Sequence, residues 1–150
     1  MKIVKNIVLI LFVAFVGIQF IPTKRNQSDT IPVTDFILVN NVPNNIKRKL
    51  QVSCYDCHSN NTNYPWYNKT QPVAWFLEDH IKEGKSELNF SEWDSLSNRR
   101  KASKLRSIIK QIESNKMPLE SYTSIHKDAE FSEEEKSTII KWITQLKDSL

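Results

Sequence analysis

The chain has 150 residues, which is enough for one domain, and its two glycines and six prolines are too few for a fibrous or disordered protein. Its formal net charge is +4, and the whole excess comes from the first 25 residues. The rest of the chain carries 17 acidic residues and an equal number of basic ones. The overall charge therefore gives no support for nucleic-acid binding.

Residues 1–22 have the pattern of an export signal. Two lysines precede an apolar run over residues 7–21 that only Gly17 and Gln19 interrupt. The run lacks a small-residue cleavage site at its end. Together with the residues that precede it, the run approaches the roughly 20 apolar residues needed to cross a bilayer. We therefore expect a transmembrane signal-anchor helix here, with a cleaved signal peptide as the alternative.

Either alternative places the following domain outside the cytoplasm, in the cell envelope. An uncleaved segment would make the membrane a partner and hold the domain on the periplasmic side of the inner membrane. Cleavage would release the domain into the periplasm. Residues 23–43 are rich in Asn, Thr, Ser and Pro, and they predict a tether with one short apolar contact at residues 36–39.

Residues 44–150 predict an all-α domain of about four to five helices, because no segment alternates as a strand. A first helix is expected from about Asn45, and Pro72 suits the first turn of a second one that Gly84 can end. Ser132 and Glu135 have the spacing of a capping box at the start of a C-terminal helix. Another helix is expected over residues 98–114, where one apolar stripe is formed by Leu105, Ile108, Ile109 and Ile112.

The residues Cys54-Tyr55-Asp56-Cys57-His58 form a C-x-x-C-H sequence, the attachment motif of c-type haem. Two thiols three residues apart on a helical turn face the same side, so both can add to the vinyl groups of one porphyrin. His58 follows at once and can bind the iron as proximal ligand. Its other ring nitrogen would then bond a carbonyl or carboxylate, which fixes the tautomer.

Three other uses of these residues stay open. A zinc site could join Cys54, Cys57 and His58 to a further histidine, although no second ligand pair has the usual spacing. A thioredoxin-like redox pair would need a neighbouring βαβ pattern, which the sequence lacks. A structural disulfide would close only a very small loop and would stabilise the chain little.

A second axial ligand of the iron has three candidates. Met117 precedes Pro118 in an irregular segment before the C-terminal helix, and a loop methionine of this kind can lie over a porphyrin face. His80 falls on the apolar side of its predicted helix, and His126 falls in a polar stretch. We therefore expect Met117 as the distal ligand, with His126 and His80 as alternatives.

Three sequence blocks in order resemble the small exported haem-binding domain family related to cytochrome c. The blocks are CYDCHSNNTNYPWY, PVAWFLEDHIKEGKSELNFSEW and MPLESYTSIHKDAEFSEEEKSTIIKWI. The resemblance implies a cytochrome c-like domain with haem c bound covalently through Cys54 and Cys57 and with His58 as proximal ligand. The MP pair before the C-terminal helix is similar to the arrangement in class I cytochromes c, where the methionine is the distal ligand, which supports Met117.

The function that follows is electron transfer by a membrane-tethered periplasmic protein with one haem, exchanging electrons with redox proteins that the sequence does not identify. A haem enzyme of the peroxidase type is one alternative, although diheme peroxidases would need a second C-x-x-C-H sequence. A gas or redox sensor with a displaceable distal ligand is the other. We expect an electron carrier rather than an enzyme.

Overall fold

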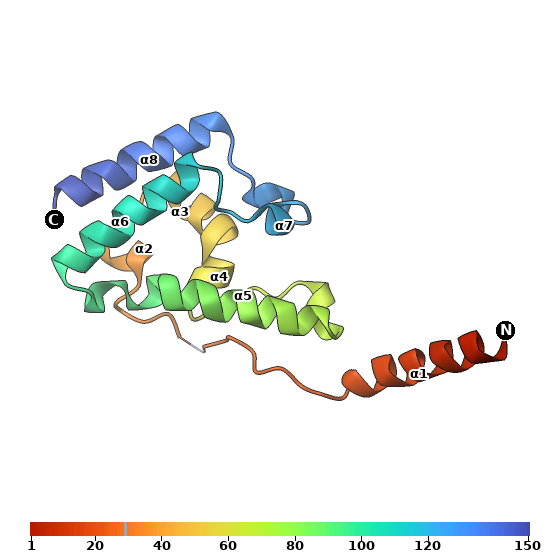
Figure 1. Cartoon of the computed structure of the whole chain (residues 1–150). Coiled ribbons are helices and arrows are strands. Elements are labelled where there is room, and N and C mark those ends of the chain that lie inside the picture. Colours follow the sequence, from red (N-terminus) through yellow and green to blue (C-terminus); the bar gives the residue numbers. More distant parts are fainter. Residues whose placement is uncertain (29) are drawn as a thin grey trace.

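Helices account for all regular secondary structure of residues 1–28 and 30–150, which are the residues that this computed structural model describes (Figure 1). The α-helices are α1 (Lys2–Ile18), α2 (Phe36–Val39), α3 (Asn44–Leu50), α4 (Asp56–His58), α5 (Val73–Glu87), α6 (Asn98–Glu113), α7 (Glu120–Thr123) and α8 (Glu133–Asp148). Shorter segments join them: the π-helical turn η1 (Gln51–Tyr55) and the 3-10 helices η2 (Trp66–Lys69), η3 (Phe90–Ser95) and η4 (Lys127–Ala129).

The expected arrangement, four to five helices behind a transmembrane helix, is wrong in two respects. Seven α-helical segments, several of one turn only, lie within residues 30–150. In the described part of the chain, no helix combines the length and the apolar character needed to cross a bilayer. Helix α1 has 17 residues, so at 1.5 Å per residue it is about 26 Å long, against a hydrocarbon core of roughly 30 Å.

Helix α1 ends at Ile18, before the end of the apolar run, and the residue that follows is bonded to the rest of the protein. The residue after the helix, Gln19, exchanges two hydrogen bonds with the backbone of Gln71, at 3.0 and 2.9 Å. The helix itself points away from the other helices and buries none of its residues (Figure 1).

Helices α6 and α8 lie side by side and run in opposite directions (Figure 1). Asn98 at the start of α6 bonds the carbonyl of Leu150 at the end of the chain, whereas Lys136 in the first turn of α8 bonds Asn115 just after α6. The predicted stripe of α6 buries Leu105 and Ile112, which pack with Ile139 and Ile143 of α8 in the core. The capping box of α8 forms as predicted, with both reciprocal bonds between Ser132 and Glu135.

Phe36 lies at the centre of the aromatic core. Its ring centroid is 5.0 Å from that of Phe90, 4.8 Å from that of Trp93 and 5.9 Å from that of Trp142. Edge-to-face pairs of this kind add stabilisation beyond the area that they bury. The predicted apolar contact at residues 36–39 is therefore a main part of the core, formed by residues that precede the predicted haem domain.

Helices α3, η1 and α4 form one continuous helical run that carries both cysteines and His58, and α5 packs against its end. The predicted stop at Gly84 is wrong, because α5 continues to Glu87. Gly84 instead lies where α5 meets Cys57: a Cβ atom added there would be 2.8 Å from the Cys57 carbonyl oxygen and 3.3 Å from the Cys57 Cβ. Glycine is needed for this close approach, not for a turn.

Replacing Gly84 by alanine should destabilise the protein. Alanine gains up to about 1 kcal/mol of helix propensity over glycine, but a clash with backbone cannot be relieved by rotating a side chain. Overpacking of this kind costs about 1–3 kcal/mol and occasionally more, so the cost of the clash should exceed the gain in helix propensity. Thermal unfolding measures the effect, with Ser86→Ala as the control because Ser86 is exposed on the same helix. A Gly84→Ala variant as stable as the Ser86→Ala variant would contradict the close packing of α5 on Cys57.

Candidate functional site

The two cysteines, His58 and Met117 line one cavity of about 270 Å³. Three parts of the chain enclose it: the η1–α4 run, the face of α5 that carries Gly84, and the segment from Met117 to Tyr122. The fold thus brings together residues that are about 60 positions apart in the sequence. Besides the four predicted residues, the lining contains Ser53, Asp56, His80, Glu83, Gly84, Glu87, Pro118, Leu119 and Tyr122.

Both cysteines are free thiols, and both are kept neutral by their surroundings. Burial raises the pKa of Cys54 to about 12, with a further contribution from the neighbouring Cys57. Burial, followed by the Asp56 carboxylate, raises the pKa of Cys57 to about 11. A redox-active C-x-x-C pair needs a lowered thiol pKa, so these values oppose the thioredoxin-like interpretation.

The imidazole of His58 is held by the backbone of α5. Its Nδ1 atom lies 2.8 Å from the carbonyl oxygen of Gly84 and 3.0 Å from that of Leu88. Because a carbonyl can only accept, Nδ1 must carry the hydrogen, and Nε2 keeps its lone pair. Burial lowers the pKa of His58, although the two carbonyl bonds oppose this shift, so the neutral ring is favoured. These are the orientation and tautomer that a metal-binding histidine requires.

The three candidates for the distal ligand differ in their positions. Met117 lines the cavity, and so does His80, whose Nδ1 lies 2.7 Å from the carbonyl oxygen of Phe76 one turn earlier in α5. His126 is not among the lining residues. Its Nε2 lies 2.9 Å from the hydroxyl of Tyr67, and its ring stacks on Tyr122 with centroids 4.3 Å apart. This contact occupies Nε2, one of the two ring nitrogens with which His126 could bind a metal.

A hydrogen bond that no sequence pattern indicates links the C-x-x-C-H run to the segment after Met117. The Tyr122 hydroxyl donates to Asp56 Oδ2 at 2.7 Å, and it also lies 3.3 Å from the carbonyl of Val52. The other carboxylate oxygen of Asp56 accepts the backbone N–H of Asn63 at 3.0 Å. Burial and this carboxylate raise the pKa of Tyr122, so its hydroxyl keeps its proton and the bond. No local signal predicts the pair, because 66 positions separate its members.

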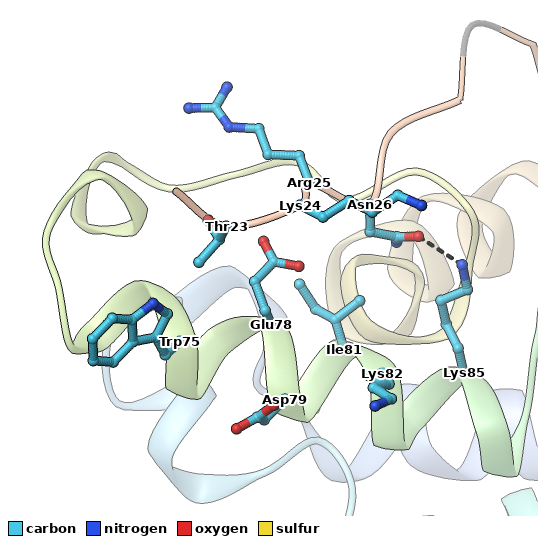
Figure 2. A pocket seen from close by; sticks show the side chains of 10 residues that line it. All are labelled: Thr23, Lys24, Arg25, Asn26, Trp75, Glu78, Asp79, Ile81, Lys82 and Lys85. Atoms are coloured by element: carbon cyan, nitrogen blue, oxygen red, sulfur yellow. Dashed lines mark hydrogen bonds between the residues drawn. The ribbon is translucent and has the colours of Figure 1, made fainter. Parts of the chain in front are cut away.

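The donor set of the cavity fits a haem better than a bare metal ion. In residues 1–28 and 30–150, no three His, Cys, Asp or Glu side chains converge in a way that could hold an ion. An imidazole nitrogen, two thiols and a thioether are instead groups that can hold a haem. A larger cavity of about 590 Å³ lies between residues 23–26 and α5, but it is lined mainly by charged side chains and contains no Cys, His or Met (Figure 2).

Comparison with known proteins agrees with this assignment. Residues 13–145 match the model of a protein family described as the haem-binding domain. No curated protein matches the chain, and no solved structure does. The family match covers most of the sequence, including the C-x-x-C-H run, the α5 segment and Met117. The chain therefore belongs to the haem-binding domain family.

Proposed function

We propose that this haem-binding protein carries its haem covalently, as haem c, and transfers single electrons in the cell envelope. Cys54 and Cys57 would hold the porphyrin through thioether bonds, and His58 and Met117 would be the axial ligands of the iron. The observation that carries the proposal is the pair of bonds from His58 Nδ1 to the carbonyls of Gly84 and Leu88. They leave Nε2 free to bind the iron. The His58 ring lines the same cavity as both thiols.

The protein's own residues supply attachment, orientation and shielding. Burial raises the pKa of both thiols and so favours their protonated form. The carbonyls of α5 hold the His58 ring and raise the basicity of its free nitrogen. The hydroxyl of Tyr122 fastens the segment after Met117 to the C-x-x-C-H run. The iron of the bound group would supply one-electron redox chemistry.

Electron transfer is preferred to catalysis because a distal side chain is available in the cavity. Met117 lines the same space as His58, so a sixth ligand can come from the protein and leave no open position for a substrate. The physiological partners would be redox proteins of the envelope. The export pattern of residues 1–22 supports that location.

Removing both thiols should abolish covalent attachment. In the Cys54→Ala/Cys57→Ala double variant, expressed with a c-type maturation system, acid–acetone extraction should remove all haem from the polypeptide. Intact-mass measurement should then find the bare chain, whereas the exposed control Ser86→Ala should retain the added mass of one haem. A double variant that keeps its haem after extraction, or a wild-type chain that never gains it, would refute covalent attachment.

Removing the methionine should change the iron without releasing the haem. Met117→Ala keeps both thiols, so the haem should stay attached, but the sulfur–iron charge-transfer band of the oxidised protein should disappear and the iron should become high-spin. His80→Ala is the matched comparison, because His80 lines the same cavity. If the band persists in Met117→Ala, or if only His80→Ala alters the spin state, Met117 is not the distal ligand.

Carbon monoxide separates the electron carrier from the two alternatives. The reduced wild-type protein should bind the gas weakly and slowly, because Met117 must first be displaced, and Met117→Ala should bind it at once. Absorption spectra recorded with and without the gas give the result. Rapid binding by the wild-type protein would instead favour a peroxidase-like enzyme or a gas sensor with a displaceable ligand.

A further inference from the structure

Residues 19–28, here called the strap, are hydrogen-bonded along the loop that joins α4 to α5. At one end, Gln19 pairs with the backbone of Gln71, and the Gln71 side chain donates to the carbonyl of Ile21 at 3.1 Å. At the other end, the backbone N–H of Ser28 donates to Asn61 at 2.8 Å. The strap therefore follows the loop over most of its length, although a signal segment is predicted up to residue 22 and a tether from residue 23.

Asn26 is the most heavily bonded residue of the strap. Its backbone N–H donates to the Tyr64 hydroxyl at 2.6 Å, and its carbonyl accepts from the Thr62 N–H at 3.0 Å. Its side-chain Nδ2 donates to the Ser59 carbonyl at 2.8 Å and to Thr62 Oγ1 at 2.9 Å. Its Oδ1 accepts from Lys85 Nζ at 2.6 Å (Figure 2). Every polar group of Asn26 thus has a partner.

The partners of the Asn26 side chain are the immediate neighbours of the groups that hold His58. Ser59 follows His58 in the chain, and Lys85 follows Gly84, whose carbonyl accepts from His58 Nδ1. One carboxamide therefore bridges the segment that carries the imidazole and the helix that orients it. Ser59 is 2% exposed and Thr62 is 5% exposed, so water has little access to replace these bonds.

The Asn26 bridge is local, because a gap separates the strap from α5 over residues 23–26. This gap is the larger cavity of about 590 Å³, and the side chains of Glu78 and Ile81 point into it from α5 (Figure 2). The bond from Lys85 to Asn26 closes the end of this cavity. Loss of the Asn26 carboxamide would leave the strap without its side-chain contact to this part of α5.

We propose that Asn26 is a positioning residue for the proximal histidine, acting by clamping the Ser59–Thr62 loop to α5. The effect on the iron's reduction potential rests on the proposed function, whereas the effect of Asn26 on the hydrogen bonds of His58 does not. When the clamp is lost, the His58 ring should move more freely relative to the Gly84 and Leu88 carbonyls. Weaker bonds from Nδ1 make Nε2 a poorer electron donor, which should raise the reduction potential of the bound iron.

The test compares full-length wild type with Asn26→Ala and Lys85→Met, and uses Gln27→Ala as the control because Gln27 is the exposed neighbour of Asn26. Nitrogen-15 NMR of the haem-free chain reads the His58 tautomer and the exchange of its Nδ1 hydrogen. Wild type and Gln27→Ala should show the Nδ1–H form. Asn26→Ala loses the three hydrogen bonds of the carboxamide, so it should exchange this hydrogen about tenfold faster or more. Lys85→Met should show a smaller change in the same direction.

The reduction potential of the haem-loaded proteins gives the second readout, and it should rise in Asn26→Ala but not in Gln27→Ala. Faster exchange of the His58 Nδ1 hydrogen with an unchanged reduction potential would show that Asn26 has a structural role only, and would overturn the proposal. An unchanged exchange rate in Asn26→Ala would also overturn it. If Asn26→Ala does not fold, Lys85→Met decides the matter by the same criteria. Failure of the wild-type chain to take up haem would refute the proposed function, while the NMR measurement would still decide whether Asn26 positions His58.

Discussion

The site depends on one interaction, the bonding of the His58 imidazole to the backbone of α5. Two carbonyls, from Gly84 and Leu88, converge on Nδ1 at 2.8 and 3.0 Å. They fix both the tautomer and the direction of the ring, and they do so with backbone groups that no side-chain rotation can withdraw. This geometry requires α5 to lie against Cys57 more closely than any residue with a Cβ allows, so Gly84 has two roles. It leaves room for the contact and supplies half of the acceptors.

Around this interaction, the protein keeps its chemically reactive groups neutral and its polar groups paired. The two thiols are protonated because burial disfavours their thiolates, and the imidazole is neutral for the same reason. Asp56, which lies between the cysteines, is bonded by the Tyr122 hydroxyl and by the backbone of Asn63. The site therefore combines low polarity with a fixed network, which suits a large apolar cofactor better than a hydrated ion.

The segments before residue 44 contribute to both the core and the site. Phe36 packs edge-on against Trp93 and Trp142, from parts of the chain that are far apart, and its burial is nearly complete. Asn26 connects the residues that follow His58 to α5. The family match likewise begins at residue 13, well before the C-x-x-C-H run. These observations make residues 19–28 and 36–42 part of the folded structure around the site and the core.

Features that depend on short spacings could be predicted from the order of the residues. The helical class, the extent of α6, the capping box of α8 and the C-x-x-C-H motif all follow from residues within a few positions of one another, where periodicity and side-chain chemistry act directly. The contacts between distant groups could not be predicted in this way and follow from how the helices pack. In the folded chain α5 continues past Gly84 and α1 ends at Ile18. Met117 but not His126 lines the cavity, and Tyr122 is bonded to Asp56. The physical reason is that these contacts depend on how the helices pack, and packing is set by the whole core and not by any local pattern.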